Sequence, residues 1–232
     1  MTDKTQRNVA DARTNLARAL SDVLEERTHI RPARCSLVTD LAVAIGANVG
    51  LRGPGLQRLD LAVRLRDIGK FGVPAAVLAK TGPLTDEEWA AICAHPQLGH
   101  DLAREVSFLR PVAAIIAAHH ERFDGKGYPR GLRGEKIPLE ARICAIADAY
   151  HSMVTDRPYR DALPTSHARQ EIIRNSGTQF DPRAVNAFVE AERALAAGLC
   201  EAATTADNPP HHDSAPLLPR LPLGLLPFRF QR

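Results

Sequence analysis

The chain has 232 residues, 44% of them hydrophobic, which suits one domain with a buried core, with or without tails. This composition excludes fibrous, collagen-like and wholly disordered proteins. The 30 basic and 27 acidic residues leave a formal net charge of +3. That excess is too small to indicate a nucleic-acid partner by charge alone, and we expect none.

Residues 1–13 are polar and charged, and they lack the apolar run of a secretory signal. The longest uninterrupted apolar run, 112–118, is far shorter than the ~20 residues that span a bilayer. The cysteines lie far apart and form no Cys-x-x-Cys pair, so we expect reduced, buried thiols. These cysteines are Cys35, Cys93, Cys144 and Cys200. We therefore expect a cytoplasmic protein that does not cross a membrane.

Apolar residues recur at helical spacing near the N-terminus, which predicts an amphipathic helix within residues 1–30. They are Val9, Leu16, Leu20, Val23 and Leu24. Two interpretations stay open for this helix. It is either the first helix of the core, or a signalling or dimerisation helix through which the chain forms a homodimer.

Helical spacing and start signals continue along the chain. Thr85 and Glu88 have the spacing of a capping box, and Asp181 before Pro182 is typical of a helix start. No segment alternates in the manner of a strand, so we predict an all-α fold, a bundle of roughly seven helices. Beyond residues 1–30, the expected helices are 33–49, 56–68, 86–94, 96–106, 111–121, one opening at Pro138, and one from 181 to near Gly198.

The composition changes near residue 202, where proline, asparagine, histidine and serine become frequent. This predicts a disordered C-terminal tail over 201–232. The adjacent His211 and His212 would bind a metal only weakly there. We thus expect an N-terminal helix over 1–30, a helical domain over 31–200, and the tail.

Five residues suggest a metal centre, because imidazole and carboxylate groups stand at helix ends or in apolar helices. A charged carboxylate among alanine and isoleucine is costly to bury unless it is paired or ligates a cation. Taken singly, a histidine at a helix end can complement the helix dipole, and an aspartate usually faces solvent. The five residues are Asp67, His95, His119, His120 and Asp148.

The stretch from Arg66 to Asp181 resembles the HD-GYP branch of the HD superfamily of metal-dependent phosphohydrolases. Arg66-Asp67-Ile68-Gly69-Lys70 stands where that family has His-Asp-Ile-Gly-Lys, and His95-Pro96-Gln97-Leu98-Gly99 matches its His-Pro-x-x-Gly. The run from His119 to Pro129, with Gly127-Tyr128-Pro129, matches the signature that names the branch. Ala147-Asp148, residues 156–160 and residues 177–182 also fit.

The resemblance implies an HD-superfamily helical bundle with a long Gly-Tyr-Pro loop. It also implies a phosphodiesterase that opens cyclic di-GMP, in a family that uses two or three iron or other transition-metal ions. For this chain we expect one or two divalent ions, iron or manganese. Asp67 is then a bridging ligand, Asp148 completes one metal, and His95, His119 and His120 hold the other.

The resemblance also implies substrate contacts. Lys70 would act with Asp67 in catalysis by touching a phosphate oxygen. Gly127, Tyr128 and Pro129 would line the substrate groove, and a diguanylate cyclase could dock on this loop. Arg157 and Arg160 would grip a phosphate or a guanine edge, unless they pair with nearby aspartates.

Three positions depart from the family pattern. Arg66 replaces the naming histidine, and a guanidinium cannot ligate a metal. Arg34 falls where a further histidine is expected, and His151 where an aspartate is usual. We hypothesise that Arg66, and Arg34 with it, supplies positive charge that a metal would otherwise bring.

Two functions follow. The first is a metal-dependent phosphohydrolase acting on cyclic di-GMP or a related phosphodiester, with a weakened metal site. The second is a catalytically degenerate module that binds the nucleotide or docks a protein partner. The retained lysine, histidines and aspartates favour the enzyme, and Arg66 favours the module.

Overall fold

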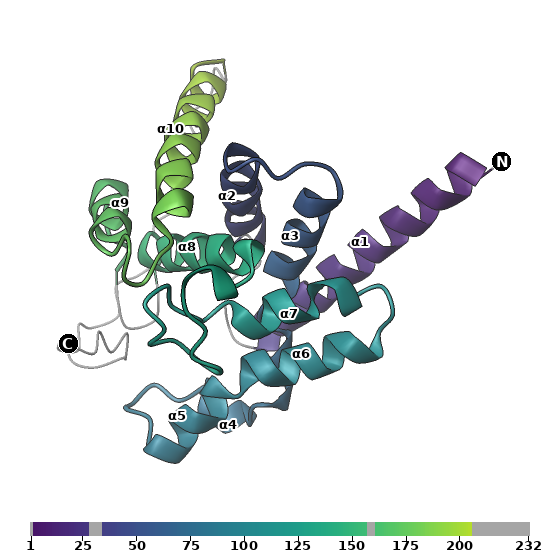
Figure 1. Cartoon of the computed structure of the whole chain (residues 1–232), viewed down its shortest axis with the longest axis vertical. Coiled ribbons are helices and arrows are strands. Elements are labelled where there is room, and N and C mark those ends of the chain that lie inside the picture. The colour runs from purple at the N-terminus through teal and green to yellow at the C-terminus, as the bar shows by residue number, and fades with distance from the viewer. Residues whose placement is uncertain (1, 28–33, 157–160, 206–232) are drawn as a thin grey trace, which may run out of the picture.

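The computed structural model describes residues 2–27, 34–156 and 161–205 (Figure 1). Regular structure in these ranges is helical, apart from one isolated bridge between Ser176 and Phe180. The prediction of an all-α fold is confirmed. The helices are α1 (Thr2–Arg27), α2 (Arg34–Asn48), α3 (Pro54–Leu65), η1 (Ile68–Gly72), α4 (Ala75–Leu78), α5 (Asp86–Cys93), α6 (His95–Glu105), α7 (Arg110–Ala118), η2 (Gly134–Lys136), α8 (Leu139–Met153), α9 (Thr165–Arg174) and α10 (Pro182–Thr205).

Two apolar clusters meet at α3 and α8. In the first, α2, α8 and α10 bury Ile45, Ile143 and Phe188 completely. In the second, α3 and α7 bury Leu65 and Ile116, to 1% exposure each. Each such side chain contributes about 1.5–3 kcal/mol of transfer free energy. Because α3 and α8 contribute to both clusters, the residues at their ends are held firmly relative to each other.

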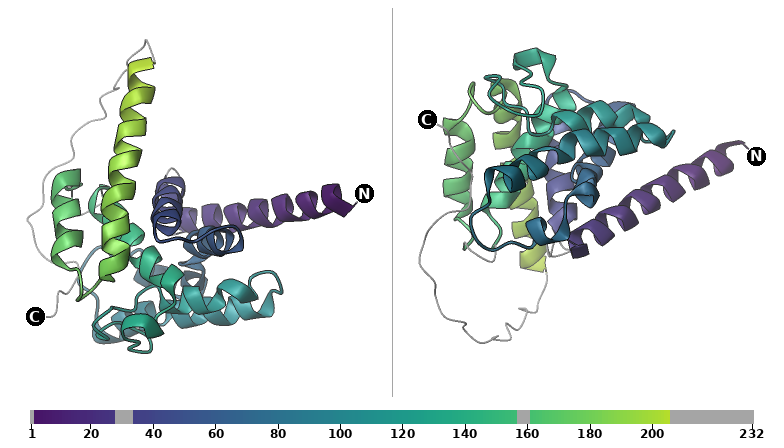
Figure 2. Two further views of the ribbon diagram at one scale, coloured as in Figure 1. Left: turned by 45° about the horizontal axis from the view of Figure 1, so that its top comes forward. Right: turned by 90° about the horizontal axis from the view of Figure 1, so that it is seen from below.

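Helix α1 packs by its C-terminal half. Ala17 and Leu24 are buried, and the helix lies against α3 and η1. Towards the N-terminus it extends away from the other helices (Figures 1 and 2). Leu16 and Val23 point away from this packing and are 48% and 53% exposed. One face of this helix therefore belongs to the core, while Leu16 and Val23 leave exposed apolar side chains on another face.

Two predicted helix starts are present. The Thr85 hydroxyl accepts from the Glu88 amide at 3.3 Å, and the Glu88 carboxylate accepts from the Thr85 amide at 2.7 Å. At α10, the Asp181 carboxylate accepts from the Arg183 amide at 2.9 Å. Each contact satisfies an amide that the first turn of a helix leaves without an intrahelical partner.

Several predicted boundaries were wrong. The third helix ends at Leu65 instead of 68, and residues 68–72 form the tighter η1. The helix after Pro111 ends at Ala118. Helix α10 continues through Gly198 to Thr205, so the expected boundary between 200 and 201 falls inside a helix. One glycine costs a helix only about 1 kcal/mol, which its alanine-rich neighbours offset. The short α4 and the polar α9 were not predicted.

Some expectations lie outside the described residues. These are the tail beyond 205 with His211 and His212, Arg157 and Arg160, and the side chain of Arg34.

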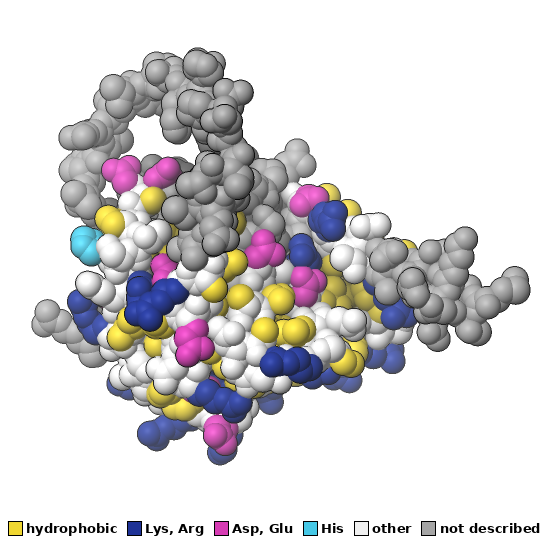
Figure 3. All heavy atoms as spheres, turned by 90° about the horizontal axis from the view of Figure 1, so that it is seen from above, with side chains coloured by type: hydrophobic (Ala, Val, Ile, Leu, Met, Phe, Trp, Pro, Cys, Tyr) yellow, Lys and Arg dark blue, Asp and Glu magenta, His cyan; other side chains and the backbone are white. Residues whose placement is uncertain are grey.

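Among the described cysteines, Cys93 and Cys144 are free thiols. In the described ranges, no helix has both the length and the apolar character needed to cross a bilayer. On the face in Figure 3, basic and acidic side chains lie interspersed among neutral and apolar ones.

Candidate metal centre

The predicted site residues come from four separate parts of the bundle. Asp67 lies between α3 and η1, and Lys70 lies within η1. His95 is the first residue of α6, so it begins this helix instead of ending the preceding one. His119 and His120 directly follow α7, while Asp148 lies inside α8. The structure brings all of them to one place.

Close backbone packing sets the position of Asp67 relative to His95. A Cβ atom on Gly69 would lie 1.9 Å from the carbonyl oxygen of His95 and 2.5 Å from the amide nitrogen of Gly99. Only glycine allows η1 to approach the first turn of α6 so closely. This contact places the Asp67 carboxylate 3.4 Å from Nε2 of His95.

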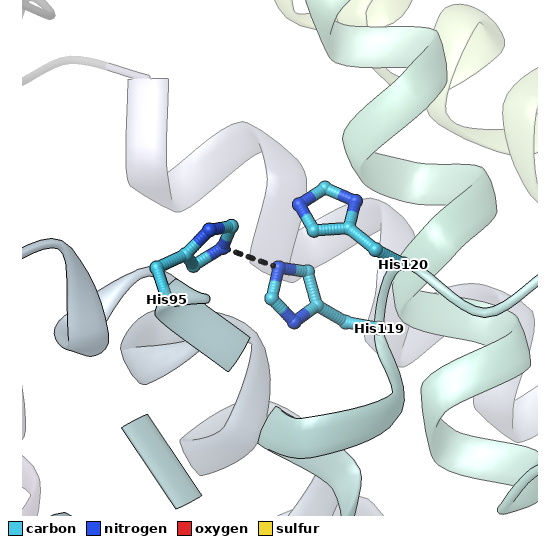
Figure 4. A group of neighbouring side chains, drawn as sticks. All are labelled: His95, His119 and His120. Atoms are coloured by element: carbon cyan, nitrogen blue, oxygen red, sulfur yellow. Dashed lines mark hydrogen bonds between the residues drawn. The ribbon is translucent and has the colours of Figure 1, made fainter. Parts of the chain in front are cut away.

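His95 and His119 present their Nε2 atoms to each other. Each ring donates its Nδ1–H to a backbone carbonyl at 2.7 Å, His95 to Ile92 and His119 to Ile116. In a neutral ring, Nε2 then carries a lone pair and no proton. The two Nε2 atoms lie only 3.3 Å apart (Figure 4). Two lone pairs at that distance repel unless a cation lies between or beside them.

Both rings are neutral near pH 7. Burial, and after it the charge of a protonated His95, lowers the pKa of His119 to about 4. Burial likewise lowers the pKa of His95, although Asp67 acts in the opposite sense. A neutral imidazole whose Nδ1–H is held by a carbonyl is the usual state of a metal-ligating histidine. The residues present therefore fit a metal ion.

His120 completes a group that we call the histidine cluster, His95, His119 and His120. The ligand atoms of these three rings all lie within 4.8 Å of one another. Burial, together with the neighbouring histidines, holds the pKa of His120 well below its usual value. Its ring stacks on Tyr128, with centroids 4.9 Å apart and planes inclined by 28°. Three neutral imidazoles thus converge beneath the predicted Gly-Tyr-Pro loop.

Asp67 adds a carboxylate to this cluster and is bound by Lys70. The Lys70 ammonium lies 2.8 Å from Oδ1 of Asp67, the same oxygen that faces His95. Burial raises the pKa of this carboxyl, but the charges of Lys70 and Arg66 more than offset it and hold the pKa well below its usual range. Asp67 is therefore ionised and available as a ligand.

Asp148 is paired with Arg66, which lies 82 positions earlier in the chain. Nε and Nη2 of Arg66 each lie 2.9 Å from Oδ1 of Asp148. Nη1 donates to the Val63 carbonyl at 2.8 Å, and Nε lies 3.8 Å from Oδ2 of Asp67. Burial raises the pKa of Asp148, but Arg66 offsets this and the pKa is lowered overall.

The Gly-Tyr-Pro loop folds back over the cluster, with a cis peptide bond between Tyr128 and Pro129. A Cβ atom on Gly127 would lie 2.3 Å from the Arg122 nitrogen and 2.6 Å from the His120 oxygen. The Tyr128 amide donates to the same His120 oxygen at 3.2 Å. Glycine at 127 therefore allows the loop to contact the residues that follow the two histidines.

Sequence reasoning gave no role to Glu121, which holds this loop. Its carboxylate is only 4% exposed and accepts from the amides of Arg130 at 2.8 Å and Leu132 at 3.0 Å. Trp89 makes an edge contact with Tyr128, with centroids 6.4 Å apart. The sequence offers no local signal for these contacts. The amides that Glu121 accepts from lie nine and eleven positions further along the chain, and Trp89 belongs to a separate helix, α5.

The comparisons with known proteins agree with this geometry. The HD domain family matches residues 17–184. The chain belongs to the HD domain family. It is 36% identical over 193 residues to the cyclic di-GMP phosphodiesterase response regulator RpfG of Xanthomonas campestris, covering 82% of this chain and 51% of the relative. It is 37% identical over 178 residues to a cyclic di-GMP phosphodiesterase of Thermotoga maritima, covering 76% and 48%.

Solved HD-type structures share the fold. A cyclic GMP-AMP specific phosphodiesterase of Vibrio cholerae superposes with a TM-score of 0.59 at 23% identity, over 83% of this chain and 50% of that one. The HDG"Y"P protein Bd1817 of Bdellovibrio bacteriovorus gives 0.55 at 21%, over 69% and 51%. The predicted resemblance to the HD-GYP branch is confirmed. This HD-domain chain spans about half the length of the two curated relatives above.

Proposed function

We propose that this HD-domain chain is a metal-dependent phosphodiesterase that hydrolyses cyclic di-GMP or a related cyclic dinucleotide. The observation that carries the proposal is the pair of Nε2 atoms of His95 and His119, 3.3 Å apart and beside the Asp67 carboxylate. Such an arrangement calls for a cation. The names of the relatives, cyclic di-GMP phosphodiesterases, support the choice of substrate.

The histidine cluster and Asp67 are the proposed ligands of a divalent transition metal. Imidazole nitrogens with a carboxylate suit iron, manganese or zinc, and we expect iron or manganese. A bound ion of this kind supplies Lewis-acid activation of water and of a phosphoryl oxygen. The carbonyls of Ile92 and Ile116 fix the ring orientations, so the cluster is organised before an ion arrives.

Lys70 is the proposed phosphate contact. Its side chain is 20% exposed and now pairs with Oδ1 of Asp67. When Asp67 serves as a metal ligand, its charge is shared with the ion, and the ammonium is free to meet a phosphate oxygen of the substrate. Charge that develops on that oxygen during phosphodiester cleavage is then stabilised by an existing cation.

The loop of Gly127, Tyr128 and Pro129 is the proposed wall of the substrate groove. Tyr128 stacks on His120 and thereby covers one side of the cluster. Arg157 and Arg160 remain proposed contacts to a phosphate or a guanine edge. A diguanylate cyclase as a partner on the loop, a homodimer through α1 and a cytoplasmic location also remain proposals.

One observation favours the alternative, a degenerate nucleotide-binding module. Oδ1 of Asp148 receives both Nε and Nη2 of Arg66, a fixed cation that competes with a metal ion for this carboxylate. A pocket with Arg66 and Lys70 could hold a phosphodiester by charge without hydrolysing it.

The test uses protein purified without oxygen. Bound metal is measured by elemental analysis, and the same sample is incubated with cyclic di-GMP while linear products are followed. We expect turnover, and we expect His119→Ala to lose the metal and at least about 100-fold of the rate. His100→Ala is the matched control, because His100 lies on α6 and pairs with Asp101 outside the cluster. Nucleotide binding without turnover supports the nucleotide-binding module. Absence of both contradicts the phosphodiesterase and the nucleotide-binding module, and it favours a module that docks a protein partner.

A further inference from the structure

The Arg66 guanidinium is the feature of this centre that fits least well with the binding of several metal ions. Its side chain is 14% exposed, and three of its nitrogen contacts are fixed: two to Oδ1 of Asp148 and one to the Val63 carbonyl. Because Val63 belongs to α3, the guanidinium is anchored to the helix that precedes Asp67. It therefore lies between the two aspartates of the centre as a built-in cation.

Two carboxylates and two cationic side chains surround the Arg66 guanidinium position, counting Arg66 itself, and their formal charges cancel. Asp67 and Asp148 are ionised, while Lys70 lies 2.8 Å and Arg66 2.9 Å from a carboxylate oxygen. The histidine cluster is neutral. A single divalent ion at the cluster would therefore give the centre a net charge of two positive units.

Among the described residues, Asp148 is the carboxylate left to complete a second divalent ion beside Asp67. Such an ion would compete with Arg66, because Oδ1 of Asp148 receives both Nε and Nη2 of its guanidinium. Displacing the guanidinium would leave a buried cation without its counter-ion and next to two further positive charges. Arginine cannot relieve this by losing its proton.

We infer that the Arg66 guanidinium takes the place of a second metal ion, so that Asp148 is its counter-ion and the centre holds one divalent cation at the histidine cluster. This inference rests on the proposed function, because it assigns the ion count of the same centre. It concerns the charge and stoichiometry of the site, which can be measured without any turnover.

The experiment counts ions in the full chain. Protein freed of metal by a chelator is titrated with Mn²⁺ by calorimetry, and the metal retained after dialysis is measured by elemental analysis. We expect one Mn²⁺ per chain for the wild type. Arg66→His removes the fixed charge and supplies an imidazole beside Asp148, so we expect two Mn²⁺ per chain.

A matched control lies on the same pair of helices. Arg58 of α3 pairs with Glu140 of α8 at 3.0 Å, eight positions before Arg66 and Asp148 respectively. Arg58→His makes the same substitution in the same type of ion pair, away from the centre. We expect it to keep one ion per chain and the wild-type affinity.

A double variant keeps the test decisive if Arg66→His does not fold. In Arg66→Met with Asp148→Asn, both charges are removed together, so no buried ion is left alone. We expect this variant to keep one Mn²⁺ per chain, with affinity within about threefold of the wild type, because neither residue is a ligand in our assignment. Loss of the ion would identify Asp148 as a ligand and overturn the inference.

The remaining outcomes separate this inference from the proposed function. Two ions in the wild type, or one ion in a folded Arg66→His variant, overturn the inference and leave a metal-dependent phosphodiesterase intact. No ion in the wild type or in any variant contradicts the proposed function, and the inference with it.

Discussion

Acid should destabilise the metal-free protein through its buried histidines, and His119 allows the effect to be calculated. The pKa of this ring is about 4 in the folded chain, because of burial. In the unfolded chain it returns to about 6.5. Between these two values the unfolded state binds more protons than the folded state, so the free energy of unfolding falls as the pH falls.

The magnitude follows from the shift in pKa. Each pH unit within this window changes the free energy of unfolding by about 1.4 kcal/mol. Lowering the pH from 7.5 to 4.5 should therefore cost about 2–3 kcal/mol through His119 alone. His95 and His120 act in the same direction, since their pKa values are also lowered. The lowered pKa values of Asp67 and Asp148 act in the same direction, but their contribution is lost mainly below about pH 5, at the acid end of this range.

Urea unfolding followed by circular dichroism, at pH 7.5, 6.5, 5.5 and 4.5 in the presence of a chelator, measures this loss. His119→Gln should be less stable than the wild type at pH 7.5 but should lose about 2–3 kcal/mol less on acidification. His100→Gln, which changes the partly exposed partner of Asp101 outside the cluster, should keep the wild-type slope. If His119→Gln and the wild type lose the same free energy between pH 7.5 and 4.5, His119 is not a buried neutral ring and our reasoning about the cluster is wrong.

Three further substitutions test the supports of the site. Glu121→Gln should cost about 1.5–3 kcal/mol in urea unfolding, because one loop amide keeps only a neutral acceptor and the other meets an NH2 donor. An unchanged stability would contradict that role. Gly127→Ala places a Cβ atom 2.3 Å from a backbone nitrogen, so the loop should shift and Mn²⁺ affinity should fall by about tenfold in calorimetry. Thr85→Ala removes only a helix cap, and we expect a loss of about 1 kcal/mol, or about 2–4 °C in Tm, with Mn²⁺ affinity unchanged.

Local sequence determined the helices and most of the residue types at the site. The capping box at Thr85 and the start at Asp181 are present because they involve amides within the same first turn. The closely packed Gly69 and Gly127 also stand within motifs that sequence alone identifies. Helix ends were predicted less well. No local sequence signal marks the ends at Leu65 and Ala118, and tertiary packing decides where these two helices stop.

Only the tertiary structure decided how these residues act together. The facing Nε2 atoms of His95 and His119 depend on two carbonyls at the ends of different helices. The pairing of Arg66 with Asp148 joins residues 82 positions apart, and the sequence could suggest their charges but not their contact. Glu121 holds the Gly-Tyr-Pro loop only because the folded chain brings the amides of Arg130 and Leu132 to its carboxylate. Patterns of three or four residues specify local geometry, whereas the charge state and ion count of a centre depend on distances across the whole fold.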